Sequence, residues 1–236
     1  MAIINNGAKS LLTSGLFPIA LSVSINTGDL QHPHNYWQFQ QLVKGIEKTC
    51  KKLALPLDSG EVPYHFATSR KKVVQPLLGI AIIGQDQPNL NWIRKSSLKN
   101  GDLLYLLGNP RENLNGSTYV RYIHNLSNTT SPAIDWVEET QLNELIIELI
   151  RDKRIKAIQQ VMTGGLFFAL LRLGIQENTG FNLETVNTFR TDAFLFEESP
   201  GRIVVAIDAT QQEEWLQYLV SNNLNFAYLG EVFENQ

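Results

Sequence analysis

The stretch FPIALSVSINTGDLQHPHNYWQFQQLVKGIEKTC, residues 17–50, decides the fold class of this chain. Residues 17–25 are mostly apolar or β-branched, which predicts a buried strand. A turn follows at 26–34. A helix is expected over about 35–54, because apolar residues recur there at i, i+3, i+4 and i+7. A strand that leads through a short turn into a long amphipathic helix indicates mixed α/β layers.

The rest of the chain continues this alternation of strands and helices. Further strands are expected at 75–85, 102–108, 155–162, 192–197, 202–207 and 225–232, and helices at the amino terminus, from Ser117, and at 138–152, 163–176 and 210–221. The polar residues 86–102 indicate a domain boundary near 90–100. We therefore expect two α/β domains with mixed sheets, 1–95 (truncated at its start) and 96–236.

Composition narrows the class of protein. The 236 residues are 43% hydrophobic and 18% charged, with a net charge of −3. This balance argues against a polybasic surface for nucleic acid or membranes. The single cysteine, Cys50, lies on the apolar stripe of the 35–54 helix and is interpreted as a core residue, not a nucleophile. Because no secretory signal or membrane-spanning run of residues is present, a cytoplasmic location is expected.

Two stretches in the first domain have the composition of a ligand site. Asn26-Thr27-Gly28-Asp29 follows a buried strand; Asp29 either holds a metal or caps the turn, and the second alternative is favoured. Ser59-Gly60-Glu61 opens the polar stretch 57–70. There Gly60 would let the backbone approach a ligand, and Glu61 offers carboxylate oxygens for Mg²⁺. A solvent-facing turn is the competing interpretation.

Two stretches in the second domain are similar. In 159–165, Thr163 could cap a helix whose free N–H groups bind phosphate, or Gly164 and Gly165 could serve close packing; the two alternatives are equal. In 196–202, a polar hairpin between two strands is the simpler interpretation. The four histidines form no zinc motif, and no phosphate-binding loop, dinucleotide fingerprint or nucleophile elbow occurs.

Taken in order, these stretches resemble a known family, phosphoribosylformylglycinamidine synthase (formylglycinamide ribonucleotide amidotransferase), and specifically the second half of its synthetase subunit. The resemblance covers about residues 3–231. The G-S-x-Y and W-Q-F blocks favour this family over selenophosphate synthetase or thiamine-monophosphate kinase. The residues of this chain that carry the resemblance are Ile25-Asn26-Thr27-Gly28, Trp37-Gln38-Phe39, Gly45-Ile46, Cys50, Pro56, Ser59-Gly60-Glu61-Val62-Pro63, Gly101-Asp102 to Gly108, Leu114, Gly116-Ser117, Tyr119, 159–166 and 195–202.

The resemblance implies two domains like the amino- and carboxyl-terminal domains of aminoimidazole ribonucleotide synthetase. It also implies an ATP-dependent C–N ligase of purine biosynthesis. Such an enzyme phosphorylates the amide oxygen of formylglycinamide ribonucleotide with Mg²⁺-ATP, and glutamine-derived ammonia then displaces the phosphate. The implied partners are the other half of the synthetase or a second copy of this chain, and a glutaminase as the ammonia source.

The resemblance assigns nucleotide or substrate binding to Asn26, Gly60, Glu198 and Ser199, and a metal to Glu61. Four sites depart from the family pattern, Glu61 among them. Val23 replaces an aspartate or asparagine, Glu61 an asparagine ligand of Mg²⁺, and Pro63 a serine; Gln159-Gln160 replaces a histidine-aspartate pair. Glutamate can still bind a metal, whereas valine and proline offer no polar side-chain atoms.

Two hypotheses follow. In the first, the chain is a fragment or divergent half of the ligase that contributes one wall of an ATP-dependent site and is inactive alone. In the second, it is a non-catalytic scaffold or dimerisation half whose nucleotide site has decayed. Nucleotide binding discriminates between them.

Overall fold

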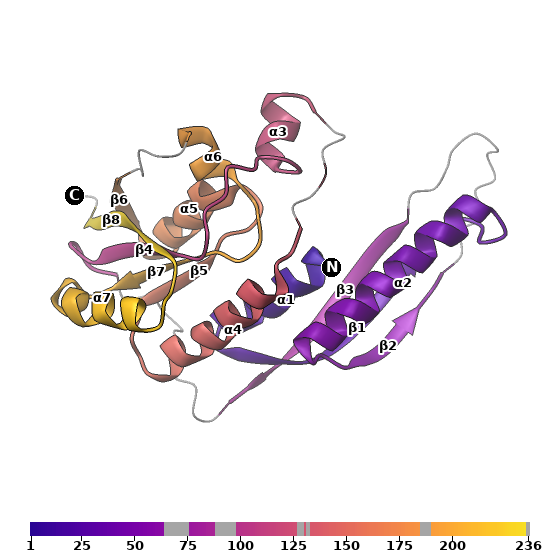
Figure 1. The fold of residues 1–236 in the computed structure, drawn as a ribbon, viewed down its shortest axis with the longest axis horizontal. Helices are drawn as coiled ribbons and strands as arrows, with labels where there is room; N and C mark the ends of the chain where they lie inside the picture. Colours follow the sequence, from indigo (N-terminus) through magenta and orange to yellow (C-terminus); the bar gives the residue numbers. More distant parts are fainter. Residues whose placement is uncertain (64–75, 88–97, 127–129, 131–132, 185–189, 235–236) are drawn as a thin grey trace. The chain divides into compact units, whose positions relative to one another are not determined.

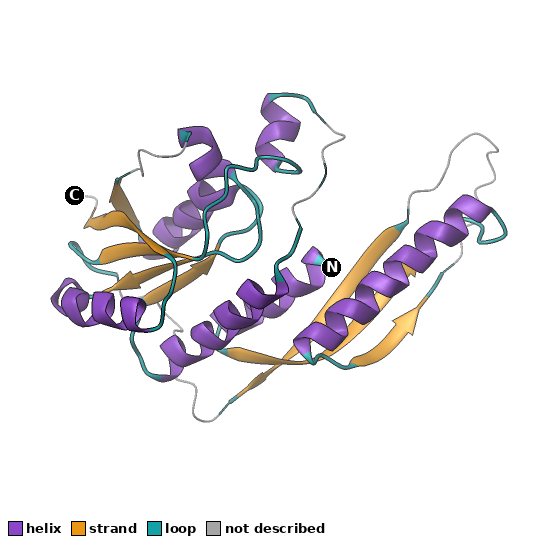
Figure 2. Ribbon diagram, in the orientation of Figure 1, coloured by secondary structure: helices purple, strands orange, loops and turns teal. Residues whose placement is uncertain are grey.

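The computed structural model describes residues 1–63, 76–87, 98–126, 130, 133–184 and 190–234 (Figure 1). The chain divides into two compact units. The first comprises Met1–Leu11 and Leu16–Gln87, and the second comprises Leu12–Gly15 and Pro88–Gln236. Both units combine helices with strands (Figure 2), so the α/β fold class expected from the sequence is confirmed.

The first unit is built on a three-stranded sheet. Its strand order is β2-β1-β3, with β2 parallel and β3 antiparallel to the central strand β1. Residues 57–61 were expected to begin a turn; that prediction was wrong, because they pair with β1 as an edge strand. In chain order the elements are α1 (Ala2–Thr13), β1 (Leu16–Asn26), α2 (Pro33–Leu53), β2 (Leu57–Glu61) and β3 (Leu77–Asp86).

Helices cover one face of this sheet. Leu21, Val23 and Ile25 of β1 are buried in a cluster with Ile46 of α2. Helix α1 packs on the same face, since a Cβ at its Gly7 would stand 2.9 Å from Ile82 of β3. The strand predicted at 17–25 is therefore confirmed as β1, and it is buried on one side only.

The second unit is built on a five-stranded sheet in which each neighbouring pair is antiparallel, with strand order β5-β7-β4-β8-β6. Strands β4 and β7 are completely buried, as their unbroken apolar sequences predict. Its elements are β4 (Leu103–Leu107), α3 (Thr118–Ile123), α4 (Trp136–Arg151), β5 (Ala157–Gln160), α5 (Gly165–Glu177), β6 (Thr179–Leu183), α6 (Thr191–Phe196), β7 (Ile203–Ile207), the 3-10 turn η1 (Ala209–Gln211), α7 (Gln212–Ser221) and β8 (Phe226–Glu234).

Helices cover both faces of the second sheet. On one face α4 and α7 bury their apolar sides, and on the other α5 and α6 do so. The predicted buried face of α4 is confirmed, because Leu142, Leu145, Ile146 and Leu149 are all buried. Asp135 accepts hydrogen bonds from two backbone amides of the first turn of α4 and so fixes where the helix begins.

One element of the second unit was assigned the wrong type. Residues 192–197 were expected to form a strand, yet 191–196 form α6, so the 196–202 turn joins a helix to β7 and is not a hairpin. The run Ala193-Phe194-Leu195-Phe196 is too short for its periodicity to separate helix from strand. Packing decided it, since Ala193 and Phe194 are buried. Among the described residues no helix is long and apolar enough to cross a bilayer.

Candidate functional site

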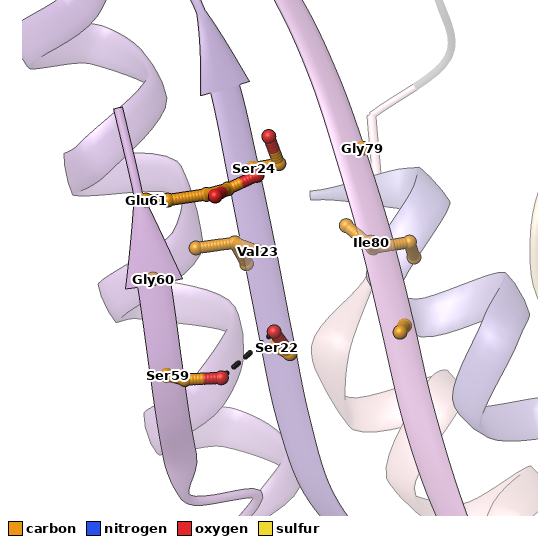
Figure 3. Close-up of a pocket in the computed structure, with 9 residues that line it drawn as sticks. Ser22, Val23, Ser24, Ser59, Gly60, Glu61, Gly79 and Ile80 are labelled. Atoms are coloured by element: carbon orange, nitrogen blue, oxygen red, sulfur yellow. Dashed lines mark hydrogen bonds between the residues drawn. The ribbon is translucent and has the colours of Figure 1, made fainter. Parts of the chain in front are cut away.

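A hollow of about 420 Å³ lies on the first sheet where β1, β2 and β3 run side by side. Figure 3 shows the Ser59 and Ser22 side chains pointing toward one another and Glu61 extending toward Ser24. The Ser59 hydroxyl donates to the Ser22 hydroxyl at 2.8 Å. The small residues Gly79 and Ala81 of β3 form the opposite side. Three hydroxyls and one carboxylate therefore share one shallow surface.

Strand alternation determines which side chains reach this hollow. Val23 faces the helices and is buried, so its neighbours Ser22 and Ser24 project from the opposite, uncovered face. The parallel register pairs Ser22 with Ser59 and Ser24 with Glu61, which places both strands' hydroxyl and carboxylate groups together. Valine at position 23 thus acts as a core residue, whereas the flanking serines supply the polar groups.

Glu61 is an exposed carboxylate at the end of β2. Within the described residues no group of three His, Cys, Asp or Glu side chains could hold a metal ion. The donor set therefore fits Mg²⁺ only if water and ligand phosphates complete the shell, which is how this ion is usually bound. Gly60 of β2 pairs with Val23 of β1, and a Cβ added at Gly60 would stand 3.3 Å from a Val23 methyl.

Asn26 ends β1, two residues beyond Ser24 and on the same face, so it lies at the same end of the sheet as Glu61. Asp29 has a different role. Its carboxylate accepts from the Gln31 amide, and its carbonyl accepts from the Asn35 side chain, so it caps the turn before α2. Pro63 follows β2 and is half-buried. Residues 64–70 of the polar stretch lie outside the described residues.

Cys50 lies in a separate, apolar groove of about 710 Å³ between α2 and β2. Burial raises the pKa of its thiol, although a backbone hydrogen bond opposes this change. A raised thiol pKa leaves little thiolate at neutral pH, so the chemistry of a nucleophile is absent there. The groove is lined by apolar residues such as Ile46 and Leu55.

In the second unit, Glu198 joins two helix starts. Its Oε1 accepts from the backbone amides of Thr118, the first residue of α3, and of Gly164, which precedes α5, both at 2.8 Å. A carboxylate at a helix amino terminus is stabilised by the helix dipole and by free N–H groups. Glu198 therefore occupies the kind of position in which helix ends bind anions.

Glu197 and Ser199 lie inside the same junction and are fully buried. The Glu197 carboxylate accepts from the Arg111 amide at 2.8 Å and lies 3.3 Å from the Arg202 guanidinium, which is also fully buried. Burial raises the pKa of Glu197, and the Arg202 charge and the Ser199 hydroxyl oppose that rise. These groups bind one another, so the segment ties α6 to β7.

The glycine turn before α5 serves close packing. Gly165 has φ +69°, and an added Cβ would stand 2.5 Å from the Leu195 carbonyl oxygen. Gly164 has φ +87°, and its amide is bound by Glu198. Of the two alternatives left open by the sequence, the contacts of this turn support packing.

Comparison with known proteins agrees with this two-unit architecture. The family model described as AIR synthase related protein, N-terminal domain, matches residues 2–85. The corresponding C-terminal domain model matches residues 99–236, more than half of the chain. The chain belongs to the AIR synthase related protein family. The resemblance inferred from its sequence blocks is thereby confirmed.

Curated relatives include the phosphoribosylformylglycinamidine synthase subunits PurL of Aquifex aeolicus and Campylobacter lari, each 28% identical. The aligned region covers 97% and 99% of this chain, respectively, but 31% of each relative. The chain thus spans about a third of the length of these relatives. The alignment extends over both units, so the whole chain corresponds to about one third of each PurL subunit.

Two solved structures share the fold. Thermotoga maritima PurL complexed with ATP matches with a TM-score of 0.73 at 16% identity. The matched region covers 99% of the present chain and 37% of the PurL chain. Escherichia coli HypE, a hydrogenase maturation protein, matches with a TM-score of 0.71 at 20% identity. The matched region covers 99% of the present chain and 73% of the HypE chain. Both units of the chain therefore have counterparts of known fold.

The structure groups the predicted site residues by unit. Asn26, Gly60 and Glu61 lie at one end of the first sheet, and Glu198 and Ser199 lie in the second unit. Sequence interpretation missed Ser22 and Ser24. The alternation of apolar and polar residues over 21–25 was the signal that could have found them, because it indicates a strand with one open face.

Proposed function

We propose that this chain forms one wall of a Mg²⁺-nucleotide site in an ATP-dependent C–N ligase assembly. One observation carries the proposal: Ser22, Ser24, Ser59 and Glu61 meet in a hollow on the uncovered face of the first sheet. Hydroxyl groups donate hydrogen bonds to phosphate oxygens, and a carboxylate binds a divalent cation. Membership of a family with PurL relatives supports the choice of nucleotide.

The proposed chemistry is that of phosphoribosylformylglycinamidine synthesis. ATP phosphorylates the amide oxygen of formylglycinamide ribonucleotide, and ammonia then displaces phosphate to give the amidine. In this assignment Glu61 holds the cation that neutralises the phosphates, and the three serines orient them, since phosphoryl transfer depends on positioning and charge stabilisation. Asn26 and Gly60 border the same site. Glu198 positions the glycine turn of the second unit, and Ser199 lies beside Glu197 in the buried junction that follows α6.

The site is proposed to be complete only in an assembly. A single carboxylate is too few ligands for a dedicated Mg²⁺ cage, so the partner and the nucleotide must supply the rest. The uncovered sheet face carries small residues beside the exposed Leu77 and Ile83, which suits packing against a second sheet. The proposed partner is the other synthetase half or a second copy, with a glutaminase supplying ammonia.

Calorimetric titration with Mg²⁺-ADP and Mg²⁺-ATP tests the nucleotide site. The unmodified chain should bind either nucleotide, and Glu61→Gln should weaken binding about tenfold or more, because it removes the charge that holds the cation. Titration without Mg²⁺ should show little difference between the two proteins. A loss that is specific to Mg²⁺ separates a metal ligand from a residue that merely supports the fold.

Asp58→Asn is the matched control. Asp58 lies on the same exposed strand with the same charge, but strand alternation points it away from the side chains of Ser59 and Glu61. It should bind nucleotide like the unmodified chain. Equal weakening in both variants would point to net charge, and binding unaffected by Glu61→Gln would refute the assignment of Glu61.

A second candidate, a non-catalytic pairing half, is favoured by Val23. That position is buried in the core, so it cannot supply the polar group that the family pattern has there. On this alternative the open sheet face pairs with a partner but binds no nucleotide. Absence of nucleotide binding, together with association that is broken by Ala81→Arg on the open face, would select it.

A further inference from the structure

Helix α5 of the second unit presents an apolar side to water. Its inner side, with Leu166, Leu170 and Leu173, is buried against the sheet. Its outer side carries large apolar residues with substantial exposure: Phe167 44%, Phe168 43%, Leu171 42% and Ile175 71%. A helix that is apolar all round is normally buried.

The outer side also has little charge. Between residues 165 and 176, Arg172 is the single charged residue in the sequence. A solvent-facing helix surface usually carries several charged side chains, as the exposed Glu144 of α4 illustrates. The composition of α5 therefore indicates a surface that another apolar surface covers.

We propose that two copies of this chain associate through α5, in an antiparallel pair around a two-fold axis at Leu171. Residues 167, 171 and 175 follow one another at four-residue spacing and form one i±4n ridge. Leu171 is the midpoint of this ridge. In an antiparallel pair, Leu171 meets its own copy, and Phe167 of each chain meets Ile175 of the other. Such self-complementarity is what a two-fold interface requires.

The aromatic residues of this surface are held in place before association. The Phe167 ring contacts Phe168 and Phe196, with centroids 5.6 Å apart in both cases. Phe196 in turn stacks on Tyr119 of α3 at 4.7 Å. Side chains fixed in this way lose less conformational entropy when they bind, and rigid aromatic groups are typical anchors of interfaces.

The exposed area predicts how tight the dimer is. From their exposed fractions, the four side chains offer on the order of 400 Å² of apolar surface per chain, about half of what one partner buries in a standard interface. We therefore expect a reversible dimer with a dissociation constant in the micromolar range. The surface lies in the second unit, so this association goes beyond the sheet pairing proposed for the first.

Analytical ultracentrifugation of the unmodified chain and of Leu171→Glu tests the proposal. Two glutamates would face each other at the axis, so the dissociation constant should rise by about a hundredfold. Leu171 is already partly exposed, and circular dichroism checks that the variant folds. Val220→Glu on α7, which is 69% exposed, is the control and should associate like the unmodified chain.

Disulfide cross-linking tests the geometry and does not depend on the charge variant. In a Cys50→Ser background, Leu171→Cys should oxidise to a covalent dimer, because the two sulfurs lie at the axis. Phe167→Cys alone should not cross-link, but its mixture with Ile175→Cys should give a heterodimer. Cross-linking of Phe167→Cys with itself would overturn the antiparallel arrangement.

The two proposed associations can be told apart. If the first-unit sheets also pair, the unmodified chain forms assemblies larger than a dimer. Leu171→Glu should then halve the number of chains in each assembly, and the variant should still bind nucleotide. A monomeric unmodified chain, or one whose assembly is unchanged by Leu171→Glu, would overturn the α5 interface. Failure of nucleotide binding would instead count against the proposed function alone.

Discussion

Replacing Glu198 by alanine should destabilise the second unit by about 3 kcal/mol. The magnitude follows from its two hydrogen bonds, since Oε1 accepts from the amides of Thr118 and Gly164 at 2.8 Å each. A hydrogen bond to a charged group contributes about 1.5–3 kcal/mol. The lower end applies to both bonds here, because Glu198 itself is only half-buried and water can partly replace its carboxylate.

Glu198→Gln refines this prediction. Glutamine keeps an oxygen acceptor but loses the charge that complements the two helix starts, so about 1 kcal/mol of destabilisation is expected. Glu144→Ala, an exposed position on α4, is the control and should change stability by less than about 0.5 kcal/mol. The order Ala, then Gln, then the control is the expected ranking of the loss.

Urea unfolding followed by far-ultraviolet circular dichroism measures these free energies, and amide hydrogen exchange locates the effect. In Glu198→Ala the Thr118 and Gly164 amides should lose protection, whereas amides of the central strand β4 should change only as far as global stability does. The explanation fails if Glu198→Ala lies within about 0.5 kcal/mol of the unmodified protein and both amides remain protected.

Three further predictions concern one pH dependence and two glycine substitutions. The Thr210 hydroxyl and amide, and then Lys156, hold the pKa of Asp208 below its usual range, so the stability it contributes is present above the unfolded-state pKa and is lost as pH falls through the folded-state value. The urea concentration at the unfolding midpoint should therefore decrease as the pH falls below about 4. Asp208→Asn should make this decrease smaller. Gly165→Ala should cost about 3 kcal/mol, because φ is +69° and the Cβ would stand 2.5 Å from a backbone oxygen of α6. Gly60→Ala should cost under about 1 kcal/mol in the same urea assay, because its nearest contact is a movable methyl at 3.3 Å.

Local pattern was sufficient wherever one face of an element is buried along its whole length. The helix expected at 138–152 is α4 over Trp136–Arg151, because its stripe of four apolar residues all reach the core. Ser117 was expected to begin a helix, and its hydroxyl accepts from the Val120 amide. In both cases the deciding pattern, an apolar stripe or a capping residue, lies within one short segment, so the sequence alone contains it.

The residues of the candidate site in the first unit were only partly predicted from the sequence. Glycine next to a carboxylate drew attention to Gly60 and Glu61. The sequence did not show that residues 57–61 form a strand, because every side chain in β2 is exposed and no burial pattern marks it. Its strand character comes from backbone pairing with β1, some 36 residues away in the chain. That pairing brings Ser59 to Ser22.

By itself the sequence determined the α/β layers, the main helices and the family. Tertiary structure alone decided the type of 191–196 and the partners of Glu198, which lie 80 and 34 residues away. Short apolar runs and polar turns carry no periodicity long enough to identify them. Their conformation is set by which distant surface they contact, and that information exists only once the chain has folded.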